Sequence, residues 1–531
     1  MLSSLGANME QSLKLLSPIV VAFSVLWLVT VIQKRVTSTK EPRTPSSGKS
    51  KIRNEFQTRP GVVRSLFVNW KTAHDYRGWF VLTMILSSAF LIRNFSRNFK
   101  KNGSIFSVSG GNFLKQIFIV EMTEFVTVIL FIYFFSFFAF AIQKIMIQLK
   151  LKYRARMVLH VVQHITQLAF ALLVSIYLLH RKYEVSISYR FAVIAETFVM
   201  YMKMVSYLGT NHYLYLETAE TGEKVPGPYH TAVELDEVDK LDIASINAIL
   251  ISRGIDTASL QIEEAKNLLI EIIKLDEYRK SIYPRNVTLA NFIEFSCLPV
   301  LVYEPKYPRT KAVNWLNLAE KLITIAGIIV FNWFLWEEFI LPAIHLAVVS
   351  PDGTTVPVEH LIEGVLDMII PLKVFVILIF YLVFECVLGA AAELLKLADC
   401  DFYADWWNST TFEEFSRKWN KPVHEFLLRH IHFEAQHVLG VSRMMATIIT
   451  FLYSIVLHEV VLLSMFGIFR PYLAFFSLFQ IPLWKIMRSP IFHNHIVGNF
   501  VFWGSLTVAW PLMVILYCRD YCMQDPRNCR I

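Results

Sequence analysis

Long, uninterrupted apolar runs are the feature that most constrains how this chain can fold. Several of them approach the roughly 20 residues that an α-helix needs to cross a bilayer. Of the 531 residues, 55% are hydrophobic and 18% are charged, whereas about a quarter of the residues of a soluble domain are charged. The runs are continuous rather than alternating, which excludes a β-barrel. The sequence therefore predicts an all-α polytopic membrane protein, a bundle of many membrane-spanning helices.

About nine spans are predicted. The first and the eighth are short, and we expect them to tilt or to insert only in part. The predicted spans are Trp79–Ile92, Phe125–Ile142, Met157–Leu179, Phe191–Leu208, Leu322–Ile344, Met368–Ala392, Met444–Met465, Tyr472–Met487 and Val497–Tyr517.

Residues 1–75 are expected to lie outside the membrane domain, which covers residues 76–531. They hold a short apolar segment, Pro18–Ile32, and then a stretch rich in Lys, Arg, Ser and Pro that is typical of a disordered basic linker in the cytosol. Residues 209–320 and 393–443 of the membrane domain are predicted to be cytosolic loops. The first of these loops contains AVELDEVDKLDIASINAILISRG and IEEAKNLLIEIIKLDEYRKSIYP, whose 3.6-residue periodicity indicates amphipathic helices.

Charge and cysteine content say little about partners. The formal net charge of +8 indicates loops that face anionic lipid rather than nucleic-acid binding. The basic residues 143–156 predict a cytosolic loop. Residues 93–112 give conflicting signals, because their basic residues favour the cytosol while the sequons at Asn94 and Asn102 favour the lumen. Cys522 and Cys529 lie close together in the C-terminal tail, where a disulfide and two free thiols fit the sequence equally well.

A histidine in the seventh apolar run is the first candidate for chemistry. At about 1.5 Å per residue, His458 lies ~21 Å from the start of that run at Met444, near the middle of a bilayer. Ionisable side chains at such a depth, here His458 and Glu459, are costly and are commonly functional. A neutral imidazole can act as a general base near neutral pH. The alternative is a histidine that only hydrogen-bonds a neighbouring helix.

The polar, aromatic segment before that run is the second candidate. Basic side chains beside flat aromatic rings suit a nucleotide that carries phosphates, through charge-assisted hydrogen bonds and ring stacking. An interfacial helix with snorkelling cations is the alternative. The basic residues are Arg417, Lys418, Lys421 and Arg429, and the others are Asp405, Trp406, Trp407, Asn408, Trp419, Asn420 and His424.

Histidine spacing raises a metal site as a further alternative. His160 and His164 stand at HxxxH spacing, and RHIHFEAQH adds His430, His432 and His437. Membrane di-iron desaturases carry several histidine boxes that usually include adjacent HH pairs, and this sequence contains no HH pair. The first two histidines also lie inside a predicted span. We therefore expect no metal site.

Residues 402–408, FYADWWN, resemble the FYxDWWN motif of the sterol and diacylglycerol acyltransferase branch of the membrane-bound O-acyltransferases. KWNKPVHEFLLRH (418–430) and VLHE (456–459) follow in the family's order. PVLVYEPKYPRT (299–310) resembles the PTLVY…YPRT stretch of sterol acyltransferases, with Val300 in place of the usual Thr. YMKMVSYLGTN (201–211) resembles the family's MKxHSY segment, with Val205 in place of His. The resemblance covers roughly residues 75–531.

This resemblance implies an acyl-CoA:alcohol O-acyltransferase, a multi-pass protein of the endoplasmic reticulum membrane whose MBOAT-type bundle encloses a reaction chamber. His458 would be the catalytic base and Asn420 its partner. Acyl-CoA would be a substrate rather than a cofactor, membrane sterol would be the acceptor, and family members often form homodimers or homotetramers. The residues implied for acyl-CoA binding are Tyr403, Trp406, Trp407, Asn408, Arg417, Trp419, His424, Arg443 and Ser454.

Two stretches favour sterol as the acceptor. LVYEPKYPRTKAVNWLNLAEK and FSRKWNKPVHEFLLRH resemble fungal sterol acyltransferases, which implies transfer of a long-chain acyl group to a sterol 3-hydroxyl to make sterol esters for storage. PVH and QIPL also occur in the diacylglycerol branch, so an acyl-CoA:diacylglycerol O-acyltransferase is the alternative. A second alternative is a non-catalytic lipid transporter in which His458 is a proton-coupled or ligand-binding group.

Overall fold

The computed structural model describes the helical body of the chain. The described residues are 122–151, 153–181, 184–221, 243–252, 283–348, 356–487 and 495–524, together with isolated positions at 96, 99, 100, 266 and 269. The expectations for residues 1–75, for the span Trp79–Ile92 and for the sequons lie outside these residues.

Regular structure in the described ranges is helical. The α-helices are α7 (Met122–Gln148), α8 (Tyr153–His180), α9 (Ile187–Thr221), α10 (Ile243–Ser252), α12 (Leu289–Cys297), α13 (Trp315–Leu335), α14 (Leu341–Val348), α15 (Val358–Phe380), α16 (Leu388–Leu394), α17 (Phe412–Trp419), α18 (Lys421–Leu427), α19 (Arg443–Phe466), α20 (Tyr472–Met487) and α21 (His495–Gln524). The π-helical segments are η5 (Trp336–Ile340), η6 (Tyr381–Val387), η8 (Leu428–His432) and η9 (Ala435–Leu439), and η7 (Trp406–Asn408) is a 3₁₀ turn.

Seven stretches of the described chain are long and apolar enough to cross a membrane. They contain seven of the predicted spans and confirm the all-α polytopic prediction. Two of them pass through a π-helical segment: α13, η5 and α14 form Trp315–Val348, and α15, η6 and α16 form Val358–Leu394. The eighth predicted span is present as α20, but its 16 residues reach only about 24 Å, less than the thickness of the hydrocarbon core.

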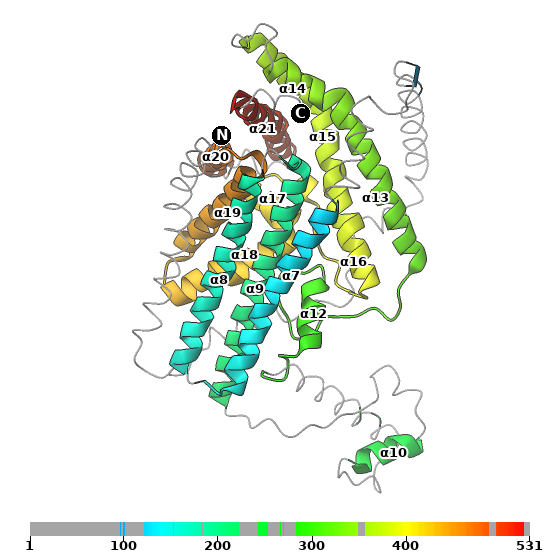
Figure 1. The fold of residues 1–531 in the computed structure, drawn as a ribbon, viewed down its shortest axis with the longest axis vertical. Helices are drawn as coiled ribbons and strands as arrows, with labels where there is room; N and C mark the ends of the chain where they lie inside the picture. Colours follow the sequence, from blue (N-terminus) through cyan, green and yellow to red (C-terminus); the bar gives the residue numbers. More distant parts are fainter. Residues whose placement is uncertain are drawn as a thin grey trace.

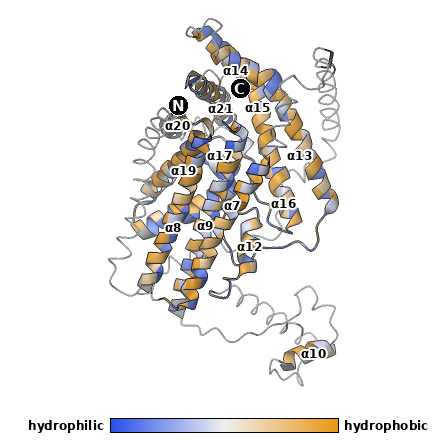
Figure 2. Ribbon diagram, viewed as in Figure 1, coloured by the Kyte–Doolittle hydropathy of each residue, from blue (hydrophilic) through white to orange (hydrophobic). Residues whose placement is uncertain are grey.

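The long helices form a bundle with α9 in its interior. Figure 1 shows α7, α8 and α9 running side by side, and α9 packs against α7, α8 and α19. In the most apolar window of α9, 67% of the residues are buried inside the protein, against 22% for α7 at the surface. On the other side of the bundle, α13 packs on α15, and α15 packs on α14 and α21. Hydrophobic residues, orange in Figure 2, cover much of the long helices.

A buried lysine holds α12 against α9. Lys203 is only 3% exposed, and its Nζ donates to three backbone carbonyls. These carbonyls lie at the C-terminal end of α12, where carbonyls lack partners within the helix and the helix dipole favours a cation. The contact therefore compensates a charge that would otherwise be buried alone. The acceptors are Phe295 (3.1 Å), Ser296 (2.7 Å) and Leu298 (2.6 Å).

Further polar side chains of the same part of α9 bind the chain on both sides of α12. The Ser206 hydroxyl accepts from the backbone N–H of Tyr303 at 2.8 Å. Asn286 donates to Asn211 Oδ1 at 2.7 Å and to the Tyr303 hydroxyl at 3.0 Å. All four residues are buried. The stretches 201–211 and 299–310, which were separate motifs in the sequence, therefore pack as one unit.

Two of the expected loops differ from their predicted form. The helix α9 continues to Thr221, so the polar segment predicted to begin at residue 209 starts later. The loop predicted at residues 143–156 is shorter: α7 ends at Gln148 and α8 begins at Tyr153, so only residues 149–152 connect the two helices. The basic Arg156 is buried rather than directed to lipid, and its guanidinium donates to Tyr283 Oη at 2.7 Å and to Met146 O at 3.0 Å. The predicted amphipathic stretches yield α10 in the first, and the second lies largely outside the described residues.

Replacement of Gly364 by alanine should destabilise the bundle. A Cβ at Gly364 would lie 2.7 Å from the Ala343 carbonyl oxygen and 2.7 Å from Ala347 Cβ, so α15 approaches α14 as closely as a glycine permits. We expect Gly364→Ala to lower the free energy of unfolding by about 1–3 kcal/mol, measured as a lower melting temperature of the detergent-solubilised protein. Gly327→Ala is the control, because its Cβ would meet nothing within 4 Å. Equal melting temperatures for the two variants would contradict the close packing.

Candidate active site

The FYADWWN stretch connects α16 to α17, and backbone pairing fixes its entry. The N–H of Ala398 donates to Pro308 O at 3.0 Å, and the N–H of Thr310 donates to Lys396 O at 2.9 Å. Between these two bonds, Arg309 and Leu397 form an antiparallel bridge. The YPRT end of residues 299–310 therefore lies beside the beginning of the FYADWWN stretch.

Three of the motif's four aromatic side chains, Phe402, Tyr403 and Trp406, are buried. Tyr403 is 4% exposed and Trp406 is 3% exposed. The Trp406 ring centroid lies 4.7 Å from that of Trp419 and 5.1 Å from that of Phe380, and Tyr403 lies 5.0 Å from Phe380. These are edge-to-face pairs, each of which contributes about 0.5–1.5 kcal/mol beyond the area that it buries. Their packing fixes the stretch on α15 and leaves Trp407 half-buried and Asn408 exposed.

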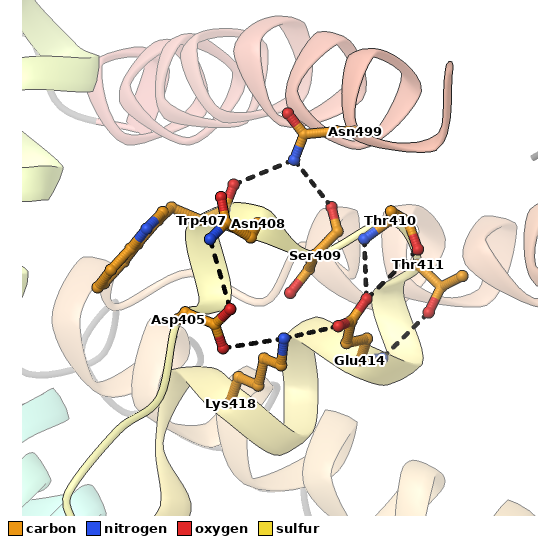
Figure 3. Close-up of polar contacts among 9 residues, drawn as sticks. All are labelled: Asp405, Trp407, Asn408, Ser409, Thr410, Thr411, Glu414, Lys418 and Asn499. Carbon is orange, nitrogen blue, oxygen red and sulfur yellow. Dashed lines mark hydrogen bonds and ion pairs between the residues drawn. The ribbon is translucent and has the colours of Figure 1, made fainter. Parts of the chain in front are cut away.

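Polar contacts hold the outer part of the motif (Figure 3). Asn499 of α21 donates from Nδ2 to the carbonyls of Trp407 and Ser409 at 3.1 and 3.2 Å. The Trp503 indole N–H, also from α21, donates to the same Trp407 carbonyl at 3.0 Å. On the other side, the ammonium of Lys418 bridges Asp405 at 3.0 Å and Glu414 at 2.6 Å. Asn408 donates to Asp405 at 3.4 Å.

Every cation of the predicted basic cluster has a carboxylate partner. A phosphate group would therefore compete with a carboxylate at each of them. Arg443, the exposed first residue of α19, makes no ion pair within the described residues. The pairs are Arg417 with Glu413 (3.6 Å), Lys418 with Asp405 and Glu414, Lys421 with Asp401, and Arg429 with Glu304 (3.4 Å).

Asn420 lies at the junction of α17 and α18. Its Oδ1 accepts from the N–H of Val423 at 3.2 Å and so caps α18. The side-chain amide Nδ2 makes no hydrogen bond within the described residues and is available as a donor. Two backbone bonds flank this residue: the N–H of Ala404 donates to Lys418 O at 2.8 Å, and the N–H of Lys421 donates to Phe402 O at 3.1 Å. Tyr403 and Asn420 are thereby held in adjacent chain segments.

His458 lies on α19, about 22 Å along the helix from its first residue. Its Nδ1 is 2.7 Å from the backbone carbonyl oxygen of Ser454. Because a carbonyl oxygen can only accept, Nδ1 carries the hydrogen and Nε2 has the free lone pair. The ring is exposed, so a second molecule can reach it, and no hydrogen bond joins it to Asn420. The neighbouring Glu459 accepts from the N–H of Ala474 at 2.7 Å and thus ties α19 to α20.

The other predicted histidine, His424, is half-buried on α18. Burial is the main cause that lowers its pKa, and the charge of Arg417 lowers it further.

His430 is 4% exposed, and burial is the main cause that lowers its pKa to about 3. A Cβ added at Gly209 of α9 would lie 3.3 Å from His430 Nδ1. Within the described residues, no group of three or more His, Cys, Asp or Glu side chains could hold a metal ion.

Four residues that position the motif were not predicted from the sequence: Lys321, Glu385, Asn499 and Trp503. Lys321 and Glu385 form an ion pair between two spans, and Tyr403 donates to the same Glu385. For Lys321 and Glu385 the sequence did contain a signal: a charged side chain within an apolar run is costly in a membrane unless it pairs with another group. The structure therefore brings Tyr403, Trp406, Trp407, Trp419 and Asn420 into one region. The predicted chamber around His458 stays a prediction.

Comparison with known proteins agrees with this arrangement of helices and motifs. The sequence profile of the family described as "MBOAT, membrane-bound O-acyltransferase family" matches residues 117–519, and the chain belongs to that family. It is similar to "Sterol O-acyltransferase 2" of Candida albicans, with 31% identity over 61% of this chain and 56% of the relative. "Probable sterol O-acyltransferase 1" of Schizosaccharomyces pombe is 27% identical over 85% of this chain and 83% of the relative. "Diacylglycerol O-acyltransferase 1A" of Glycine max is 34% identical over 45% of this chain and 48% of the relative. The match to the Candida protein thus spans little more than half of that protein's length.

Stability should fall as the pH falls below about 6.5. The pKa of His430 drops from 6.5 to about 3 on folding, so below pH 6.5 the unfolded chain binds a proton that the folded chain does not. Each pH unit in this window should remove about 1.4 kcal/mol of stability. Melting temperatures at pH 7.5, 6.0 and 5.0 would measure the loss, and His430→Leu should flatten it. His437→Leu, at an exposed histidine of the same segment, should keep the wild-type slope. An unchanged slope in His430→Leu would contradict the assignment.

Proposed function

We propose that this protein is an acyl-CoA:sterol O-acyltransferase of the endoplasmic reticulum membrane. The sterol 3-hydroxyl oxygen attacks the thioester carbonyl carbon, the carbon–sulfur bond breaks, and the sterol ester and CoA thiol leave. Acyl-CoA is a substrate, and the reaction uses no resident cofactor or metal. Membership of the membrane-bound O-acyltransferase family and the similarity to fungal sterol O-acyltransferases support this proposal.

The contact of His458 Nδ1 with the Ser454 carbonyl oxygen is the observation that carries the proposal. Its Nδ1–H donates to the Ser454 carbonyl, so Nε2 is the basic nitrogen and the ring orientation is fixed. Because His458 is an exposed residue of an apolar helix, its Nε2 can accept the proton of an alcohol that comes from the lipid phase. The same proton then goes to the departing thiolate. His458 is thus the proposed general base.

Asn420 is the proposed donor to the oxyanion. Its Oδ1 is occupied by the cap of α18, which orients the amide so that Nδ2 is directed elsewhere. An oriented amide N–H stabilises charge that develops on the thioester oxygen in the transition state. The segment that carries Trp407, Asn408, Arg417, Trp419 and His424 is proposed to bind the acyl-CoA head group, and Tyr403 and Trp406 hold that segment from inside. Arg443 and Ser454, at the start and middle of α19, are proposed to line the path toward His458.

A diacylglycerol acceptor is the second candidate. The similarity to the diacylglycerol O-acyltransferase of Glycine max supports it, and the same base and oxyanion donor would serve both alcohols. We favour sterol because the Candida and Schizosaccharomyces relatives match a larger share of this chain. Homodimers or homotetramers are proposed by family membership.

Replacement of His458 should greatly slow acyl transfer. Membranes with the wild-type protein are incubated with labelled oleoyl-CoA and one of three alcohols: ergosterol, cholesterol or diacylglycerol. The sterol incubations should form labelled sterol ester. His458→Gln should lower that rate by about 10²–10⁴-fold, the usual contribution of a general base. His345→Gln, a histidine in the separate helix α14, should leave the rate near that of the wild type.

Each other outcome has a definite meaning. Ester formation that persists in His458→Gln removes the catalytic assignment. Labelled triacylglycerol without sterol ester moves the function to the second candidate. A wild-type protein that acylates none of the three alcohols contradicts the proposed activity altogether and favours a lipid transporter.

A further inference from the structure

We infer that Glu385, paired with Lys321, is a positioning residue that fixes the catalytic Asn420 through Tyr403. The inference rests on the proposed function, because Asn420 is the proposed oxyanion donor. The positioning residue and its cation lie outside the FYADWWN motif, in two membrane spans: α13 and the stretch from α15 to α16.

The first step is the contact between the spans. Lys321 of α13 donates from Nζ to Glu385 Oε1 at 3.1 Å and to the Glu385 backbone carbonyl at 2.8 Å. The two side chains are 11% and 6% exposed, so the pair is almost fully removed from solvent. The second carboxylate oxygen, Oε2, accepts from the hydroxyl of Tyr403 at 2.9 Å. One carboxylate therefore joins α13, η6 and the FYADWWN stretch.

The local backbone is built to make this contact. Glu385 lies in η6, a π-helical segment, and such segments occur frequently at functional sites. One turn later, a Cβ at Gly389 would lie 2.8 Å from Lys321 Nζ, so the absence of a side chain there leaves room for the ammonium group. The aromatic ring of Phe384 lies 6.3 Å from Tyr403 and 6.2 Å from Trp419. The segment η6 thus contacts Tyr403 with both the Glu385 carboxylate and the Phe384 ring.

The second step leads from Tyr403 to Asn420. The residues on either side of Tyr403 make backbone hydrogen bonds to the residues around Asn420: Ala404 to Lys418 at 2.8 Å, and Phe402 to Lys421 at 3.1 Å. A shift of Tyr403 therefore moves the backbone on which Asn420 stands. An oxyanion donor must be held within a fraction of an ångström to be effective.

A buried ion pair alone is a poor source of stability, because the cost of removing two charges from water offsets their attraction. Apolar residues of similar volume commonly replace such pairs without loss of stability. What apolar residues cannot reproduce here is the acceptor for the Tyr403 hydroxyl. This difference separates a positioning role from a structural one.

The test uses the purified full-length protein in detergent, labelled oleoyl-CoA and the alcohol that the wild type esterifies. Tyr403→Phe keeps the ring and removes the hydroxyl. Lys321→Met/Glu385→Leu removes both charges and the acceptor. Glu393→Gln is the matched control, because Glu393 also joins this span to α13, through Asn314 and Asn317, but does not touch the motif.

Tyr403→Phe and the double variant should each lower kcat about tenfold, the loss expected for a hydrogen bond to a charged group. The KM for oleoyl-CoA should stay near that of the wild type. The melting temperature should fall only slightly and to a similar extent in both variants, because each removes one partner of the same buried hydrogen bond. Tyr403→Phe should add nothing in the double-variant background, and neither change should lower kcat further in an Asn420→Ala background, because groups that act through one another are not additive. Glu393→Gln should keep the wild-type kcat.

The inference is overturned if the double variant recovers the wild-type kcat along with its stability, or if its loss adds to that of Tyr403→Phe. A fully active Asn420→Ala enzyme, or an equal loss of kcat in Glu393→Gln, overturns it as well. Failure of the proposed function looks different, because the wild type then forms no ester or His458→Gln remains active.

Discussion

The rest of the structure depends on one constraint: a charged or polar group placed among apolar helices must find its partner within the protein. Lys203 shows how this works, because its ammonium ends on three carbonyls at the C-terminal end of α12. Water cannot take over this role inside a bilayer, so loss of the contact would leave a bare cation and a bare helix end. The interior helix α9 is thereby tied to the end of α12, just before the loop 299–310 that pairs with the entry to the FYADWWN stretch.

From that contact, a continuous series of pairings leads to the candidate active site. Ser206 binds Tyr303 in the loop after α12, and Asn211 binds Asn286, which lies before α12 and also donates to Tyr303. The YPRT end of that loop pairs with the chain that enters the FYADWWN stretch. That stretch in turn pairs with the segment around Asn420. Stretches that resemble the family's motifs are therefore largely in contact with one another, and their inward side chains serve the frame on which the reactive groups stand. His458 stands apart from this frame, on α19.

Much of this could be predicted from the sequence, and the limits have physical causes. Apolar runs located seven described spans because length and hydropathy decide membrane insertion locally. The predicted spans Leu322–Ile344 and Met368–Ala392 already ran across the junctions of α13 with α14 and of α15 with α16, but the π-helical segments within them were missed, since such segments leave no pattern of their own. Local pattern marked Arg417, Lys418, Lys421 and Arg429 as a basic cluster, but their carboxylate partners include residues as distant as Glu304 and could be found only from the fold. The same holds for Glu385, whose partners Lys321 and Tyr403 come from two separate segments.

The attachment of the FYADWWN stretch to α21 has a consequence for how the protein is made. Asn499 and Trp503 supply three of the donors that hold Trp407 and Ser409, and they belong to the last described helix of the chain. During synthesis, all the upstream helices leave the ribosome before these donors exist. The nascent chain therefore carries an incompletely fastened site until α21 has been made, which ties the onset of its chemistry to the arrival of that helix.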